Sequence, residues 1–146
     1  MEVRIERVGA ENDELVVIRC RAVTEEVREI AAFVRSRQGR LSGVRDDRQY
    51  EIAVSELCYI ESVDGKTFLY TKGQVFETSE RLYALEERLR PKQFLRVSKS
   101  MLLNLMKVRS IRPALNGRFT AVLHTGEEVI ISRSYVKALK AALKGE

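Results

Sequence analysis

The stretch from Phe94 to Leu105 reads FLRVSKSMLLNL and lies in the part of the chain whose charge differs from the rest. From Arg88 to the C-terminus there are 13 lysines and arginines against three acids, whereas the first 87 residues hold 13 bases and 18 acids. The net charges of the two parts are therefore +10 and −5. A basic segment of strand-like sequence is typical of a surface that binds a polyanion, most commonly nucleic acid. A solvated basic face without a partner is the alternative.

The size and composition of the chain suit one ordinary domain, or a small domain with an appendage. It has 146 residues, of which 45% are apolar, enough to build a core. Its longest apolar runs, Leu15–Ile18 and Met101–Leu103, are too short to cross a hydrocarbon layer of ~30 Å. The N-terminus interleaves charged and apolar residues and does not resemble a signal peptide. We therefore expect a cytoplasmic protein that does not itself span a membrane.

Residues 1–44 are expected to form a small ββα unit. Val3 and Ile5 alternate with charged residues, and Leu15–Ile18 is a second strand candidate. Thr24 is a candidate N-cap for a helix with an acidic first turn, and Gly39 is its candidate end. Because such a unit is too small to be stable alone, we expect it to dock on the remainder of the chain or on a second copy. Its expected role is regulation or dimerisation.

Residues 45–146 are expected to form a second domain, mainly β with helices (α+β). Apolar residues alternate from Gln49 to Val54, and the strands 57–61 and 67–71 flank a turn at Asp64-Gly65. A helix follows, with Ser79 as its expected N-cap, a leucine stripe, and Pro91 at its end. This helix is expected to cover a sheet.

The basic part of the chain is expected to form a β-meander followed by a helix. Residues 108–115 and 118–124 fit a hairpin closed by Asn116-Gly117, and 125–127 turns the chain into a strand at 128–131. The last helix is expected to begin near Ser132 or Ser134 and to bury four apolar residues. These are Tyr135, Leu139, Ala142 and Leu143.

Signatures of catalysis are weak in this sequence. It has no P-loop, no G-x-G-x-x-G, no C-x-x-C and no H-E-x-x-H. The single histidine, His124, is expected at a strand end, and Ser134 to Lys137 matches S-x-x-K without its companion motifs. Cys20 and Cys58 lack metal-ligand spacing and are expected to be buried thiols. The sequence thus predicts neither an enzyme nor a cofactor or metal site; a catalytic role would have to depend on His124.

Residues suited to bind DNA are frequent in the basic part. Lys99, Asn116, Arg118 and Arg133 lie on expected turns and loops, and such side chains donate to base edges. Other residues are expected to contact phosphates. These are Arg96, Ser100, Lys107, Arg109, Arg112, Lys137 and Lys140. The few aromatic residues here look like core positions, which favours duplex DNA over single strands.

Four motifs, in order, resemble the LytTR family of bacterial DNA-binding domains. They are LCYIES, LYALEERL, FLRVSKSMLLNL and EEVIISRSYVKALKAAL, and the resemblance covers roughly Arg45 to Leu143. It implies an elongated set of small antiparallel sheets with flanking helices. It also implies that loops of the domain enter successive major grooves and bend the duplex.

The resemblance assigns roles to individual residues. It implies that Ser98 and Lys99 read one major groove, that the hairpin around Asn116 makes an inner contact, and that Arg133 and Ser134 read a second groove. Ser98 stands where the family usually has a histidine, and Ser134 where it often has a second arginine. Two direct contacts are therefore expected to be made by hydroxyl groups.

The family also suggests how such a protein is controlled. Its members often carry a phosphoacceptor receiver domain ahead of the DNA-binding module. Here only about 40 residues precede that module, too few for the doubly wound fold of a receiver. We therefore do not expect phosphorylation of a receiver aspartate to be the switch. Stand-alone members resemble regulators that a membrane protein holds inactive, and the acidic N-terminal unit is our candidate for that contact or for dimerisation.

The sequence therefore predicts a response-regulator-like transcriptional regulator. We expect it to bind double-stranded DNA sequence-specifically, on repeated promoter half-sites, as a homodimer at least when on DNA. The alternative is an RNA-binding or ribosome-associated basic module, which would share the same electrostatics.

Overall fold

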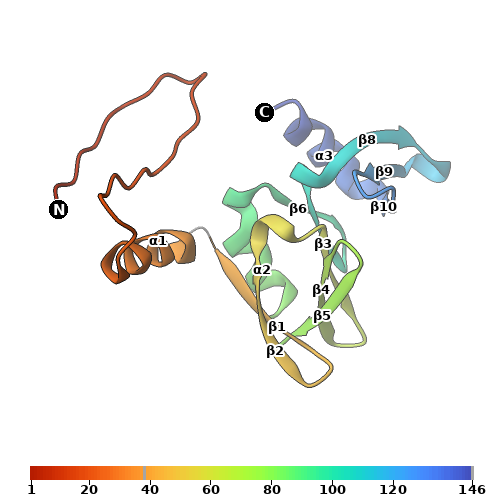
Figure 1. Ribbon diagram of the computed structural model, residues 1–146. Coiled ribbons are helices and arrows are strands. Elements are labelled where there is room, and N and C mark those ends of the chain that lie inside the picture. Colours follow the sequence, from red (N-terminus) through yellow and green to blue (C-terminus); the bar gives the residue numbers. More distant parts are fainter. Residues whose placement is uncertain (38, 146) are drawn as a thin grey trace. The chain divides into compact units, whose positions relative to one another are not determined.

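The computed structural model describes residues 1–37 and 39–145 (Figure 1). The chain divides into two compact units, Met1–Gly39 and the remainder from Arg40, and each is described by itself. The second unit begins at Arg40 rather than at the expected residue 45, because Arg40–Arg45 is a strand paired along its length with Arg48–Ala53.

Two antiparallel sheets make up most of the second unit, which confirms the predicted α+β class. The larger sheet has seven strands in the order β2-β1-β5-β4-β3-β7-β6. Their bounds are β1 Arg40–Arg45, β2 Arg48–Ala53, β3 Tyr59–Val63, β4 Lys66–Thr71, β5 Gln74–Thr78, β6 Phe94–Ser98 and β7 Met101–Asn104. The predicted β3–β4 hairpin is confirmed, with Asp64 and Gly65 at φ 51° and 79°.

Strands β1 and β5 were not predicted from the sequence. Each has few apolar residues, so the period of two is weak in both. Gly43 in β1 faces the core, where a Cβ atom would lie 2.7 Å from Cβ of Phe76 and 2.8 Å from Cδ1 of Ile52. This glycine therefore serves close packing between strands, a requirement visible only after the sheet is assembled.

Helix α2 (Leu82–Leu89) covers one face of the large sheet. Leu82, Leu85 and Leu89 are buried in a core with Ile60, Phe94 and other residues from the strands. The expectation that Ser79 caps this helix is wrong. Arg81 occupies the N-cap position without a side-chain cap, because the first residue that reaches the core is Leu82. The helix ends at Leu89, and Pro91 lies in a following 3-10 turn (η2, Arg90–Lys92).

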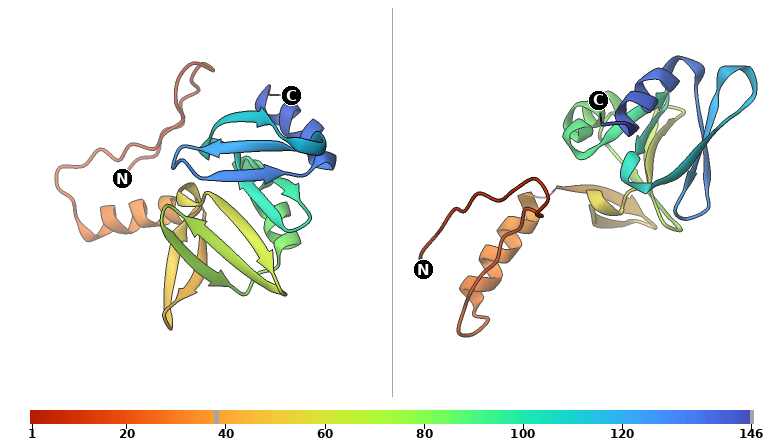
Figure 2. Two further views of the ribbon diagram at one scale, coloured as in Figure 1. Left: turned by 90° about the vertical axis from the view of Figure 1, so that its right-hand side faces the viewer. Right: turned by 90° about the horizontal axis from the view of Figure 1, so that it is seen from above.

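The smaller sheet follows the order β10-β9-β8 and packs with the last helix (Figure 2). Its strands are β8 Val108–Pro113, β9 Phe119–Leu123 and β10 Glu128–Ile131, and the helix is α3 Val136–Leu143. The predicted β8–β9 hairpin is confirmed, since Asn116 and Gly117 have φ of 61° and 76°.

The last helix differs in part from its prediction. A 3-10 turn (η5, Arg133–Tyr135) precedes it, and Leu139 is fully buried. Leu143 is 42% exposed, whereas Tyr135 and Val136 pack in part against the core of the smaller sheet.

The β6–β7 hairpin, built from FLRVSKSMLLNL, contributes to both cores. Phe94 and Leu102 lie in the core under α2, whereas Val97 and Leu103 lie in the core shared with the smaller sheet and α3. Because side chains alternate along a strand, one hairpin can supply both faces. Backbone N–H of Ser132 donates to the carbonyl of Val97 at 2.8 Å and joins the start of η5 to β6.

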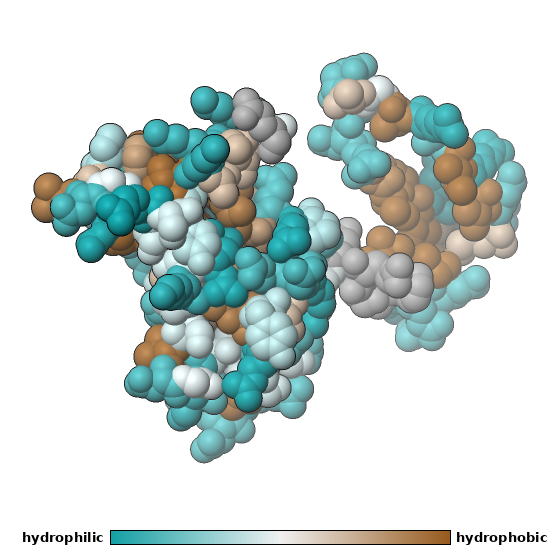
Figure 3. Space-filling model, turned by 180° about the vertical axis from the view of Figure 1, so that it is seen from behind, coloured by the Kyte–Doolittle hydropathy of each residue, from teal (hydrophilic) through white to brown (hydrophobic). Residues whose placement is uncertain are grey.

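Among its described residues, the first unit contains one helix, α1 (Glu25–Arg37). The predicted cap is confirmed, because Val27 N–H donates to Oγ1 of Thr24 at 3.3 Å. The predicted ββ portion is wrong: residues 1–24 form no strand, and Val3 and Ile5 are 86% and 93% exposed. Figure 3 shows hydrophobic residues, in brown, on the surface of this unit. A lone hairpin here would bury too little apolar surface to be stable. Cys20 is exposed, against expectation, whereas Cys58 is buried as predicted.

No helix in residues 1–37 or 39–145 has the length and apolar character needed to span a bilayer.

Asn104, at the end of the β6–β7 hairpin, is a buried polar residue whose side chain bonds two backbone groups. Its Nδ2 donates to the carbonyl of Leu57 at 2.8 Å, and its Oδ1 accepts from N–H of Met106 at 3.0 Å. We predict that Asn104→Ala lowers the free energy of unfolding by about 1–3 kcal/mol, since it leaves buried backbone groups unsatisfied. Urea denaturation measures the free energy of unfolding. The control Met106→Ala, at an exposed neighbouring position, should change this free energy by less than about 0.5 kcal/mol. Equal effects of the two substitutions would contradict the prediction.

Candidate nucleic-acid interface

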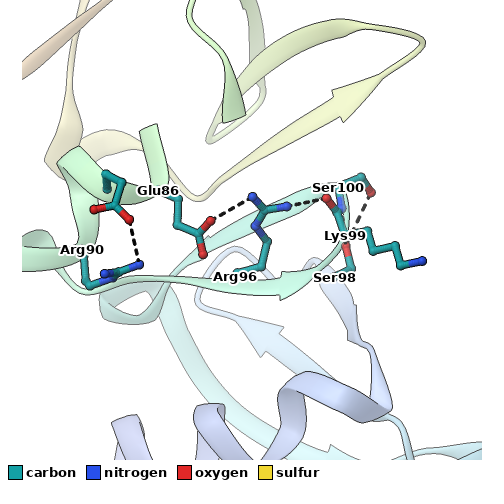
Figure 4. A network of polar contacts seen from close by, with 7 residues as sticks. Glu86, Arg90, Arg96, Ser98, Lys99 and Ser100 are labelled. Carbon is teal, nitrogen blue, oxygen red and sulfur yellow. Dashed lines mark hydrogen bonds and ion pairs between the residues drawn. The ribbon is translucent and has the colours of Figure 1, made fainter. Parts of the chain in front are cut away.

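The turn between β6 and β7 presents Lys99 to solvent on a well-held backbone (Figure 4). Arg96 donates from Nη1 to the carbonyl of Lys99, and N–H of Ser100 donates to Oγ of Ser98 at 3.3 Å. N–H of Ser62 in β3 donates to the carbonyl of Ser100 at 2.8 Å. Figure 4 shows the Lys99 side chain extending away from these contacts. The fixed backbone thus limits where the ammonium group can reach.

Arg96 has a structural role that the sequence did not suggest. Its Nη2 donates to Oε1 of Glu86 on α2 at 2.9 Å, and the two side chains are only 18% and 27% exposed. Its Nε is buried and has no hydrogen-bond partner among the described residues. We expected Arg96 to contact phosphate, but the structure directs its guanidinium to α2 and to the Lys99 turn. It is better described as a residue that positions that turn.

A second group of predicted site residues meets where the β8–β9 hairpin approaches η5. A Cβ atom on Gly117 would lie 2.9 Å from Cδ of Arg133, so the arginine stem packs directly against this glycine. Asn116, Arg118, Arg133 and Ser134 are all exposed around this contact. The hairpin tip and the η5 turn therefore form one surface, although about 16 residues of chain separate them.

The two groups are linked through β6. Ser132 precedes Arg133, Val97 precedes Ser98, and the hydrogen bond between Ser132 and Val97 joins their backbones. Ser98 itself is half-buried and Lys99 is exposed. Because this bond is part of the packed junction of the two sheets, the spacing between the Lys99 turn and the Arg133 turn is set by the fold.

The other cationic residues predicted to contact phosphate differ in their exposure and in the contacts that they already make within the chain. Arg109 and Lys137 are exposed, and neither has an ion pair with an acid of the described chain, whereas Lys107 is half-buried. Arg112 pairs with Glu128 at 2.7 Å, an exposed ion pair of the kind that stabilises little. Lys140 lies over the ring of Phe119, 4.4 Å from its centre. Arg109 and Lys137 are thus the least engaged of these cations.

Three buried or half-buried groups, Cys58, Tyr59 and Tyr70, have a raised pKa. Burial raises the pKa of the Cys58 thiol, and the nearby charge of Lys107 offsets this only in part. Burial, together with Glu127, raises the pKa of Tyr59, and burial with Glu61 raises that of Tyr70. Within residues 1–37 and 39–145 no cluster of His, Cys, Asp or Glu is placed to hold a metal ion. His124 is exposed at the end of β9.

Comparison with known proteins follows the same division of the chain. A family model described as the LytTr DNA-binding domain matches residues 47–144. A solved LytTr DNA-binding domain from Bacillus cereus superposes with a TM-score of 0.67 at 23% identity, over 71% of this chain and 95% of that one. The likeness between the two structures establishes a common fold.

Curated relatives match over the same part of the chain. The sensory transduction protein LytT of Bacillus cereus is 30% identical over 93 residues, which is 64% of this chain and 38% of the relative. The LytT protein of Enterococcus faecalis is 29% identical, and the transcriptional regulatory protein LytR of Staphylococcus aureus is 26% identical, each over 67% of this chain and 40% of the relative. This chain therefore aligns with about two fifths of the length of these relatives.

The contact between Arg96 and Glu86 yields a prediction about the Lys99 turn. Arg96→Ala should speed amide hydrogen exchange in residues 98–100 and lower the free energy of unfolding by about 1–3 kcal/mol, because a half-buried, charge-assisted hydrogen bond is lost. Hydrogen exchange measured by NMR, together with urea denaturation, tests this. The matched control is Arg90→Ala, which removes an exposed ion pair with Glu87. Unchanged exchange at the turn in Arg96→Ala would show that Arg96 does not position it.

Proposed function

Because this chain belongs to the LytTR family of DNA-binding domains, we propose that it binds duplex DNA sequence-specifically and regulates transcription. The observation that carries this proposal is the contact of Arg133 with Gly117, next to the strand that leads to Lys99. The contact between Arg133 and Gly117 forms one group of exposed hydrogen-bond donors, and the hydrogen bond between Ser132 and Val97 holds this group at a fixed spacing from the Lys99 turn. Protruding turns on a rigid scaffold are suited to enter the grooves of a duplex.

We assign base reading to the two groups of turn residues. Lys99 and Arg133 are assigned as the principal donors, since each is exposed, carries a long cationic side chain and lies at the centre of one of the two groups. Ser98 and Ser134 would add hydroxyl contacts, and Asn116 and Arg118 would contact the duplex from the β8–β9 hairpin. Arg109 and Lys137 would bind phosphates, which adds affinity without discriminating between sequences.

The proposal extends to assembly and control. We propose that the protein binds repeated half-sites as a homodimer and acts in the cytoplasm. The first unit, Met1–Gly39, is the candidate for dimerisation or for contact with an inhibitory membrane protein. Support comes from its exposed apolar residues, including Leu15, Val16 and Val17, which are 66–71% exposed. Contiguous exposed apolar surface commonly marks an interaction site.

The salt dependence of binding tests the electrostatic part of the proposal. The logarithm of the association constant for DNA should fall linearly with the logarithm of salt concentration, with a slope of about −0.9 for each phosphate contacted. Fluorescence anisotropy on a DNA fragment selected from genomic DNA measures this slope. A flat response would reject DNA binding through this surface. If RNA of equal length competes better than duplex DNA at fixed salt, the RNA-binding module is the correct alternative.

The division into base readers and phosphate contacts gives a second test. Lys99→Ala and Arg133→Ala should each cost about 1–3 kcal/mol of binding free energy on the selected site and less on random DNA. Lys137→Ala should weaken both complexes alike, because a phosphate contact carries no sequence information. Lys137 suits this better than Lys140, which packs on Phe119. If all three variants lose the same affinity on both DNAs, the assignment of readers is wrong.

A further inference from the structure

An open hollow lies beside the Lys99 turn, between three parts of the second unit. Arg81 borders it at the start of α2, Ser62 and Thr67 border it from β3 and β4, and Lys99 and Ser100 border it from the β6–β7 turn. Its volume is about 560 Å³, within the range of about 300–1,000 Å³ that small-ligand sites occupy. The hollow is therefore large enough to admit a ligand group.

The charge lining this hollow is one-sided. Arg81 and Lys99 are exposed, and neither forms an ion pair with an acid of the described chain. Arg96 also borders the hollow, but Glu86 offsets its charge. None of the described residues that line the hollow is an aspartate or a glutamate. Two uncompensated cations thus face a space that also offers hydroxyl groups from Ser62, Thr67 and Ser100.

The start of α2 adds to this positive potential. No side chain caps the helix, and no acid stands in its first turn. The nearest acid in the chain, Glu80, pairs instead with Arg88. The unsatisfied N–H groups and the positive end of the helix dipole, near the bordering residues Leu82 and Tyr83, therefore remain available to an anion.

We propose that this hollow is a phosphate-binding site. Guanidinium, ammonium, hydroxyl and backbone N–H groups together match the acceptors of a phosphate group. The inference rests on the proposed function, because Lys99 belongs both to the hollow and to the turn that would read bases. The phosphate would then be a backbone phosphate of the DNA strand next to the base that Lys99 contacts. A free phosphorylated small molecule would present the same chemistry.

The variant Arg81→Ala tests whether the hollow binds a phosphate group. This variant should bind the selected DNA and random DNA more weakly by the same factor, and its salt slope should be smaller in magnitude by about 0.9, the value for one phosphate. Since Arg81 is exposed and makes no ion pair in the described chain, the variant should fold, which circular dichroism checks. Arg48→Ala is the matched control, because it removes an exposed arginine from β2, the edge strand opposite β6. The control should leave the slope unchanged.

A second arm tests the free ligand. Inorganic phosphate and pyrophosphate are titrated into the DNA-free protein, with chloride at equal ionic strength as reference, and amide NMR shifts are followed at Ser62, Gly65, Thr67 and Tyr83. Saturable shifts that vanish in Arg81→Ala and that compete with DNA would identify a free phosphorylated ligand as an occupant. A change of salt slope in Arg81→Ala without such shifts would identify the DNA backbone.

The two arms also separate this inference from the proposed function. If the wild-type protein does not bind DNA but phosphate gives saturable shifts at the hollow, the DNA-binding proposal fails and the phosphate site stands. If DNA binds with the same salt slope in wild type, Arg81→Ala and Arg48→Ala, and phosphate gives no shifts beyond those of chloride, the phosphate site is refuted while DNA binding stands.

Discussion

The burial of both faces of the β6–β7 hairpin is the constraint on which the second unit depends. Phe94 and Leu102 complete the core under α2, and Val97 and Leu103 complete the core of the smaller sheet. Because side chains alternate along a strand, a shift of register by one residue would exchange the two sets and disrupt both cores. Buried Asn104 fixes the end of the hairpin to the backbone near Leu57. The hairpin thus joins the two sheets, together with Cys58 and Tyr59, which also pack against the core of the smaller sheet.

The candidate interface follows from this junction. Lys99 lies at the tip of the shared hairpin, and Arg133 lies one residue beyond the hydrogen bond between Ser132 and Val97. The same hairpin carries Arg96, which connects the tip to Glu86 on α2. The same residues therefore complete the cores and position the side chains, Lys99 and Arg133, that are proposed to contact a duplex.

Predictions from the sequence were correct where adjacent residues determine the structure, and they failed where residues distant in the sequence determine it. The β3–β4 and β8–β9 turns were predicted because Asp64-Gly65 and Asn116-Gly117 favour positive φ within the turn itself. Strands β1 and β5 were missed because their identity depends on neighbours: Gly43 is required only once Phe76 lies against it. The strands expected in residues 1–24 have the right alternation, but alternation alone does not provide a partner. Ser79 looked like a cap, but packing of Leu82 sets where α2 begins.

By itself the sequence determined the separation of charge along the chain, the main hairpin turns, the leucine stripe of α2, the family and the residue types available to bind a polyanion. These depend on composition or on neighbours within a few positions. Only the tertiary structure decided that Arg96 is held by Glu86, that Arg133 lies against Gly117, and that Arg81 and Lys99 border one hollow. Each of these contacts joins residues 10 to 18 positions apart on different elements. Their proximity follows from how the sheets and α2 pack, which no local pattern encodes.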